Sequence, residues 1–88
     1  MQKIFPSLLC ANPLTLSSDI KLLEPYVAGF HIDCMDFHFV PNLAFGFDTI
    51  HAIAASTDKP LQIHLMVEYP ERYLDRLKAP KHSRIILH

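Results

Sequence analysis

The 88-residue sequence lacks several features that would place it in particular classes of protein. No apolar run approaches the roughly 20 residues of a membrane span, and residues 1–6 lack the long apolar stretch of a signal peptide. The only cysteines, Cys10 and Cys34, are too few for a disulfide framework and lie in apolar runs, as reduced core thiols of a cytoplasmic protein do. A formal net charge of −1 supplies no bulk charge to recruit nucleic acid or a membrane surface.

The composition is that of a small globular protein. Half of the residues are hydrophobic and 19% are charged, which is not the balance of a disordered chain. The length allows one small domain, and no linker or low-complexity tract divides it. Seven prolines and two glycines instead break the sequence into short alternating pieces.

These pieces alternate between strand-like and helix-like patterns. The apolar runs of strand length are residues 4–11, 30–35, 60–67 and 84–88. Amphipathic segments with helical spacing begin at Pro13, Asp48 and Pro70, the last of them reaching Leu77. The order β-α-β-α-β-α-β predicts a parallel sheet with right-handed crossovers and therefore an α/β fold.

Polar residues interrupt one face of the second and third predicted strands. Side chains two apart on a strand point the same way, so each strand has one mixed face and one apolar face. The mixed faces carry His31, Asp33 and Met35 on one strand and Gln62, His64 and Met66 on the other. We expect the apolar faces to pack against helices and the mixed faces to look inward, bringing two imidazoles and a carboxylate onto neighbouring strands.

Two interpretations of this cluster follow from the spacing alone. Histidine and aspartate in a core are costly unless they are paired or bound to something, so they form either a hydrogen-bonded pair that fixes the core or a metal site. Imidazole and carboxylate donors suit divalent ions of the zinc, manganese, iron or cobalt class, and three protein ligands leave positions open for substrate. The four basic residues between Lys78 and Arg84 similarly indicate a solvated loop or, alternatively, a phosphate site.

Three blocks of sequence resemble the ribulose-phosphate 3-epimerase family. They are PSLL at residues 6–9, HIDCMDFHFVPN at residues 31–42, and HLMV at residues 64–67 with Pro70 behind it. The resemblance runs in order from Lys3 to His88, which is nearly the whole chain. Relatives that act on D-allulose 6-phosphate carry very similar blocks, so the resemblance indicates the family more firmly than the sugar.

The resemblance implies a fold and a set of site residues. The family fold is a (β/α)₈ TIM barrel, of which residues 1–88 resemble the N-terminal half, with about four strands and three helices. Asp33 is implied to be the general base and a metal ligand, with His31 and His64 as further ligands. Ser7 resembles the substrate-binding serine, and His64 is implied by the resemblance to contact the substrate as well. The methionines that pack around the reacting carbons are matched by Met35 and Met66, although methionines on an inward face also serve as core filler.

The implied reaction is the metal-dependent epimerisation of a ketose phosphate at C3, from D-ribulose 5-phosphate to D-xylulose 5-phosphate through an enediolate. The second catalytic aspartate and the phosphate-binding loops of the family lie in the other half of the barrel. We therefore expect this chain to be a fragment of a longer enzyme or a half-barrel that assembles. Assembly would be as a homo-oligomer or with the remainder of the barrel. The alternatives are a non-catalytic relative that binds metal or a partner, an epimerase for D-allulose 6-phosphate, and a metallohydrolase using the same ligands.

The loop after the second predicted strand departs from the family pattern. Phe37 stands where the family usually has glycine, at a place where glycine often allows a positive φ, so a bulky residue there adds strain or fills part of the pocket. Asp36 lies one residue off the face of Asp33 and is expected to brace the loop. The loop and helix histidines His38, His51 and His82 are expected to be solvated rather than ligands.

Overall fold

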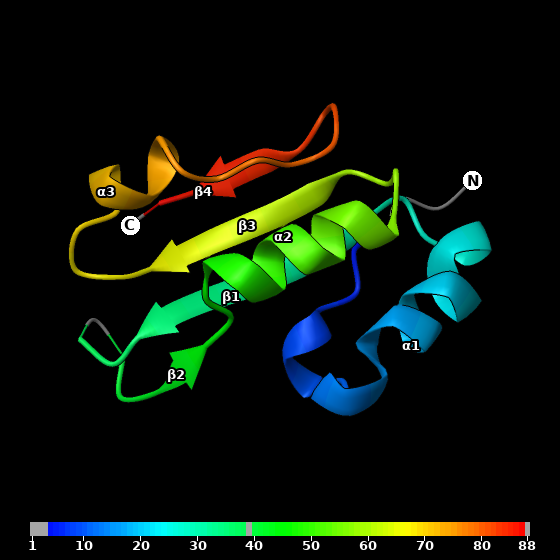
Figure 1. Cartoon of the computed structure of the whole chain (residues 1–88), viewed down its shortest axis with the longest axis horizontal. Helices are drawn as coiled ribbons and strands as arrows, with labels where there is room; N and C mark the ends of the chain where they lie inside the picture. The colour runs from blue at the N-terminus through cyan, green and yellow to red at the C-terminus, as the bar shows by residue number, and fades with distance from the viewer. Residues whose placement is uncertain (1–3, 39, 88) are drawn as a thin grey trace.

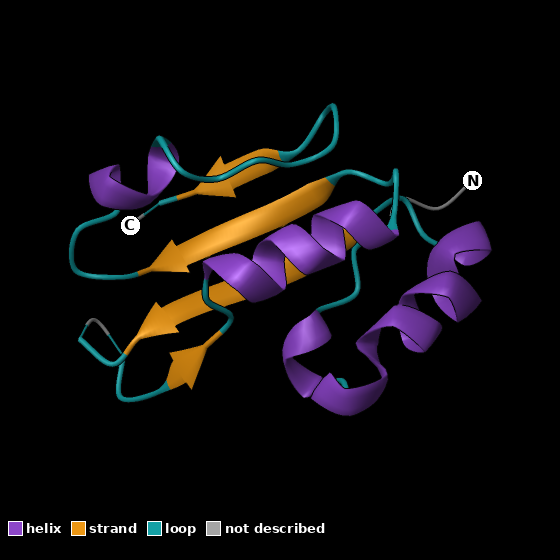
Figure 2. Ribbon diagram, in the orientation of Figure 1, coloured by secondary structure: helices purple, strands orange, loops and turns teal. Residues whose placement is uncertain are grey.

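The computed structural model describes residues 4–38 and 40–87 as an α/β arrangement with one sheet and its helices (Figures 1 and 2). The strands are β1 (Phe30–Asp36), β2 (Leu43–Ala44), β3 (Leu61–Met66) and β4 (Arg84–Ile86). The α-helices are α1 (Leu16–Leu23), α2 (Phe47–Ser56) and α3 (Glu71–Leu74). Short 3₁₀ turns cover Leu8–Cys10, Pro13–Thr15 and Glu24–Tyr26. No helix in the described part of the chain has both the length and the apolar character needed to cross a bilayer.

The sheet has the strand order β2-β1-β3-β4. As the βαβ pattern predicts, β1, β3 and β4 are parallel, with α2 connecting β1 to β3 and α3 connecting β3 to β4 (Figure 1). Strand β2 pairs antiparallel with the end of β1, through Met35 and Asp36. Ser7 makes an isolated parallel bridge to His31, so the chain before α1 also runs alongside β1.

The apolar core lies on one face of this sheet, between the strands and helices α1 and α2. In Figure 1 α2 runs along the sheet in front of β1, and its Ile50 and Ile53 are buried, as is Ile20 of α1. The strand residues that face this layer are all buried, namely Phe30, Ile32, Cys34, Leu61, Ile63 and Leu65. Cys34 is free and buried, and burial raises the pKa of its thiol to about 11, whereas the side chain of Cys10 lies outside the described part.

Three sequence expectations need correction. Residues 4–11 do not form a continuous strand, because the Ser7 hydroxyl accepts a hydrogen bond from the Leu9 backbone N–H at 3.2 Å and starts a 3₁₀ turn at Leu8. The third helix ends at Leu74, well before Leu77. The sheet is not wholly parallel, because the loop that follows β1 folds back as β2.

The other elements follow the local signals of the sequence. Asn12 caps the turn that leads into α1, its side chain accepting from the Leu14 N–H at 3.0 Å, with Pro13 in the first position. Glycine is required at position 29 by a close approach, because a Cβ on Gly29 would overlap the Pro60 carbonyl oxygen and the Phe5 ring. The chain therefore enters β1 pressed against the start of β3.

A polar contact joins the two helical segments at the end of the sheet where the strands begin. Thr57 is 4% exposed, and its hydroxyl donates to the Glu24 carboxylate and accepts from the Lys59 N–H at 3.1 Å. The Thr57 hydrogen bond is the largest cause that lowers the pKa of Glu24 below its ordinary value of 4.5. A carboxylate whose pKa is lowered by folding stabilises the fold above its unfolded pKa, and this stabilisation is lost as the pH falls through its folded pKa.

We predict that Thr57→Val lowers the free energy of unfolding by about 1–2 kcal/mol at pH 7, because it removes a buried hydroxyl and leaves the Lys59 N–H without an acceptor. The deficit should narrow as the pH falls through the lowered pKa of Glu24 in the folded wild type, because Glu24 then loses its charge in both proteins. Urea unfolding at pH 7 and at a series of pH values below 4.5 measures both effects. Thr49→Val on the exposed side of α2 is the matched control, and an equal loss in the two variants would contradict the prediction.

Candidate metal centre

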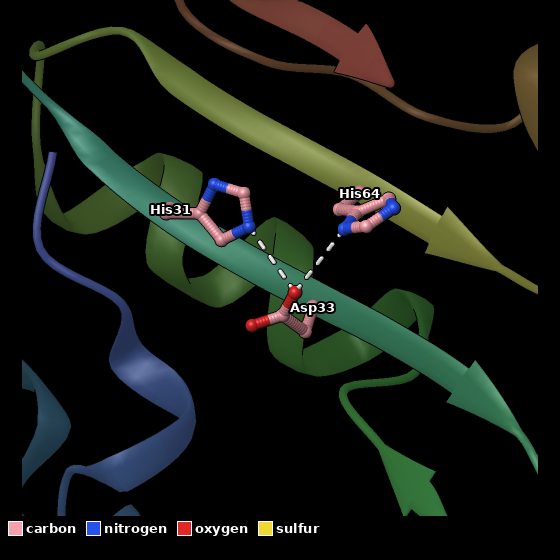
Figure 3. A group of neighbouring side chains, drawn as sticks. All are labelled: His31, Asp33 and His64. Atoms are coloured by element: carbon pink, nitrogen blue, oxygen red, sulfur yellow. Dashed lines mark hydrogen bonds and ion pairs between the residues drawn. The ribbon is translucent and has the colours of Figure 1, made fainter. Parts of the chain in front are cut away.

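The candidate site lies on the face of the sheet opposite the helical core. Residues alternate along β1 and β3 between the buried face and a half-buried one, and the half-buried positions carry the predicted polar side chains. The parallel register makes three cross-strand pairs on this face, His31 with Gln62, Asp33 with His64, and Met35 with Met66. Figure 3 shows His31, Asp33 and His64 gathered over the strands with α2 behind them.

One carboxylate oxygen of Asp33 lies at the centre of this group. Its Oδ1 atom is 3.1 Å from Nε2 of His31 and 3.4 Å from Nδ1 of His64 (Figure 3). The two imidazoles meet edge to face, with ring centroids 5.9 Å apart. The side chains of Asp33, His31 and His64 are 13%, 21% and 22% exposed, so all three are partly shielded from water but remain accessible.

A hydrogen bond from the neighbouring strand determines how His31 faces Asp33. Nδ1 of His31 is 3.0 Å from Oε1 of Gln62, which can only accept, so Nδ1 carries the hydrogen. In the neutral ring Nε2 then has no hydrogen and faces Asp33, which also can only accept when ionised. Two acceptors 3.1 Å apart attract each other only with a proton or a cation between them, and a second partner that fixes the tautomer is typical of histidines that bind metals.

The second oxygen of Asp33 is held by the segment before α1. The Ser7 hydroxyl donates to Oδ2 at 3.2 Å while accepting from the Leu9 N–H. Ser7 therefore lies at the edge of the group. It also leaves Oδ1 as the oxygen that faces both histidines.

The donor set fits a divalent metal ion. One atom from each of His31, Asp33 and His64 can be chosen so that all three lie within 4.8 Å of one another. Ligand atoms bound to one ion at about 2.0–2.2 Å lie at most about 4.4 Å apart, so the three side chains lie close to ligand spacing. Two imidazole nitrogens with one carboxylate oxygen suit the zinc, manganese, iron and cobalt class. The predicted convergence of these side chains is thus present in the structure.

The remaining predicted site residues fall around this triangle. Met35 and Met66 form the next pair towards the ends of the strands and are half-buried on the same face. Gln62 had been predicted only to share this face, and its contact with His31 required the register between β1 and β3. The basic segment from Lys78 to Arg84 is largely exposed and leads into β4 at the far side of the sheet.

The three other histidines lie outside this group. His51 accepts from the Lys78 N–H at 3.3 Å, and His82 is exposed. His38 is 62% exposed, as expected, yet it contacts Asp36 and Glu68 rather than only water. The contact with Glu68 could not be read from the sequence, because it joins two loops 30 residues apart.

The loop after β1 contains a strained residue at the place where the resemblance led us to expect one. Phe37 has a φ of 66°, in the left-handed region that a side chain with a Cβ adopts at a cost. Its side chain is 62% exposed, so the ring gains little from packing. Phe39, the next aromatic of the loop, lies outside the described residues.

Comparisons with known proteins agree with the resemblance. The model of the ribulose-phosphate 3 epimerase family matches residues 3–88. A protein of Bacillus subtilis named ribulose-phosphate 3-epimerase is 45% identical over 75 residues, which cover 84% of this chain and 35% of the relative. The Chlamydia pneumoniae protein of the same name is 42% identical over 84 residues, 94% of this chain and 37% of the relative.

A plant relative shows the same partial coverage. The chloroplastic ribulose-5-phosphate-3-epimerase of Arabidopsis thaliana is 41% identical over 80 residues, which cover 86% of this chain and 28% of the relative. The chain thus spans only 28–37% of the length of these three curated relatives. Its four-stranded, mostly parallel sheet with helices corresponds to part of an α/β barrel.

We predict that Phe37→Gly raises the free energy of unfolding by up to about 1 kcal/mol. Relief of a left-handed conformation, worth roughly 1–2 kcal/mol, exceeds the roughly 0.5–1 kcal/mol that glycine loses in backbone entropy. Phe37→Ala is the matched control, because it removes the ring but keeps the Cβ and should bring no gain. Urea unfolding of the three proteins tests this, and equal stabilisation by both substitutions would show that the ring rather than the backbone is responsible.

Proposed function

The chain belongs to the ribulose-phosphate 3-epimerase family, and on this premise we propose that it supplies the metal-binding and proton-abstracting face of a sugar-phosphate 3-epimerase. The observation that carries the proposal is the single oxygen of Asp33 that faces His31 and His64 on the open side of the sheet. Residues 1–88 would form the N-terminal half of a (β/α)₈ barrel. A cytoplasmic location stays a prediction.

In this proposal His31, Asp33 and His64 hold a divalent cation of the zinc, manganese, iron or cobalt class. When bound, such an ion would act as a Lewis acid that stabilises negative charge developing on the substrate oxygens. The donor types, their spacing within 4.8 Å and the tautomer that Gln62 imposes on His31 support this assignment. The same donors could activate water in a hydrolase, but membership of an epimerase family favours the epimerase.

Asp33 is the proposed general base. Epimerisation at C3 of a 2-ketose phosphate begins with removal of the C3 proton, which lies alpha to the carbonyl, and leaves an enediolate. The Ser7 hydroxyl, 3.2 Å from Oδ2, would orient this carboxylate and also contact the substrate. The proton must return from the opposite face, and by the family resemblance the aspartate that delivers it belongs to the other half of the barrel.

Substrate contacts follow from the same face of the sheet. Met35 and Met66 lie one pair beyond Asp33 and His64, so their side chains are proposed to pack around the reacting carbons, with His64 touching the substrate as well. D-ribulose 5-phosphate is the proposed substrate and D-xylulose 5-phosphate the product. D-allulose 6-phosphate is the second candidate, because Phe37 replaces the usual glycine in the adjacent loop and a bulky residue there bears on the size of sugar admitted.

We predict that Asp33→Asn abolishes most of the activity that this segment supports. The test replaces the matching segment of the Bacillus subtilis relative with this chain and measures epimerisation of both candidate sugars, together with exchange of the C3 proton in D₂O by NMR. Loss of a general base should lower kcat/KM by roughly 10²–10⁴-fold. Asp75→Asn, an exposed aspartate after α3, is the control and should leave activity unchanged.

Two results would count against the proposal. Retained C3 exchange in Asp33→Asn would exclude Asp33 as the base. A chimera that binds Zn²⁺ but neither exchanges nor epimerises either sugar would favour the alternative of a non-catalytic metal- or partner-binding relative.

We also predict that Gln62→Leu weakens Zn²⁺ binding by this chain about tenfold, because His31 loses the acceptor that fixes its tautomer. Gln62→Glu keeps an acceptor oxygen at that position and should retain the affinity. Competition titration against a chromophoric chelator measures both. Equal affinities of Gln62→Leu and the wild type would exclude the role given to Gln62, and absence of Zn²⁺ binding by the wild type would exclude the metal centre.

A further inference from the structure

A second polar cluster lies just beyond the candidate metal centre, where β1 and β3 end. Asp36 is the last residue of β1, and its Oδ1 atom accepts a hydrogen bond from the His38 backbone N–H at 3.1 Å. Its Oδ2 atom accepts from the backbone N–H of Glu68, at 3.2 Å. One carboxylate therefore holds backbone groups from the loop after β1 and from the turn after β3.

The His38 side chain also contacts both residues that this hydrogen bond joins, Asp36 and Glu68. Its Nδ1 atom donates to the Asp36 carbonyl oxygen at 3.0 Å, and its Nε2 atom lies 3.5 Å from Oε2 of Glu68. Since the two ring nitrogens face different partners, His38 bridges the two loops and does not offer a ligand group of its own. We call Asp36, His38 and Glu68 the loop clamp.

The carboxylate of the clamp is ionised at neutral pH. Desolvation raises the pKa of Asp36, but the N–H groups of Glu68 and His38 and the charge of His38 together lower it below its ordinary value of 3.8. Hydrogen bonds to a charged acceptor are stronger than those between neutral groups. Asp36 therefore holds two backbone N–H groups through charge-assisted hydrogen bonds.

The clamp also accounts for the strained backbone of Phe37. The Asp36 side chain bonds the N–H two residues ahead, in an Asx turn, and Phe37 is the residue enclosed by that turn. A left-handed φ in a non-glycine residue persists only where the surroundings hold it. Here the turn residues are fixed on one side by β1 and on the other by Glu68.

The position of the clamp relates it to the metal ligands. The β1–β3 pairing ends at Met35 and Met66, and Asp33 and His64 form only the second pair before that end. Pairs at the end of a ladder open most easily, and such fraying would separate Asp33 from His64. The bond from Asp36 to Glu68, two residues past Met66, closes the ladder at this end.

We propose that Asp36 is a positioning residue that keeps the ends of β1 and β3 paired next to the candidate metal centre and so holds Asp33 and His64 at ligand distance. It is not itself a ligand, because it lies three residues from Asp33 on the strand and both its oxygens accept backbone hydrogen bonds. The inference rests on the proposed metal centre.

The test titrates the chain with Co²⁺, whose visible absorption reports both affinity and ligand geometry. Asp36→Ala should raise the Kd about tenfold and alter the absorption band, whereas Asp36→Asn, which keeps one acceptor, should have a smaller effect. Thr57→Val removes stability at the opposite end of the sheet and should bind Co²⁺ as the wild type does. Hydrogen exchange of the metal-free proteins should show faster exchange of the Glu68 and His38 amides in Asp36→Ala.

The possible results distinguish failure of the positioning role of Asp36 from failure of the proposed metal centre. Unchanged Co²⁺ affinity and absorption in both Asp36 variants, with wild-type binding intact, would overturn the positioning role alone. An equal loss of affinity in Thr57→Val and Asp36→Ala would also overturn it, since general destabilisation would then explain the effect. No binding by the wild type would overturn the metal centre and this inference with it. If Asp36→Ala fails to fold, Asp36→Asn decides between these outcomes.

Discussion

The candidate site depends on one oxygen atom that two imidazoles share. Oδ1 of Asp33 faces His31 along its own strand and His64 across the ladder, and each contact has a different structural origin. The first follows from the two-residue repeat of a β-strand, and the second from the parallel register of β1 and β3. Burial of three such groups is costly unless something satisfies them together, so the arrangement favours a cation or a shared proton at its centre.

The surroundings of Asp33 limit its freedom from three sides. Ser7 donates to Oδ2 from the segment before α1, Gln62 contacts Nδ1 of His31 from β3, and Asp36 accepts the Glu68 N–H beyond the ends of the paired strands. Each support comes from a different part of the chain. The site is therefore a product of the tertiary fold, and a peptide containing only HIDCMD would not reproduce it. This support by neighbouring polar groups is what a base or a metal ligand needs to keep its geometry.

Much of the fold and the site could be predicted because alternation along a strand is a local property. His31, Asp33 and His64 were placed on one face from spacing alone, and family membership follows from blocks of sequence around them. The failures involve competing local bonds and distant partners. Ser7 binds the Leu9 N–H and ends an apolar run that otherwise reads as a strand, and the helix after Pro70 stops after one turn. The contacts of Asp36 with Glu68 and of Gln62 with His31 depend on register, which periodicity does not supply.

The alternation of the two faces along β1 and β3 has a consequence for how this segment tolerates change during evolution. Candidate ligands and core residues occupy successive positions of the same strands, so a one-residue shift in the register of β1 would turn Asp33 towards α2 and Ile32 or Cys34 towards the face of the candidate site. Hydrophobic packing and the candidate site therefore require the same register of these strands. Length variation among homologues should accordingly be confined to the loops, while these two strands keep a constant number of residues.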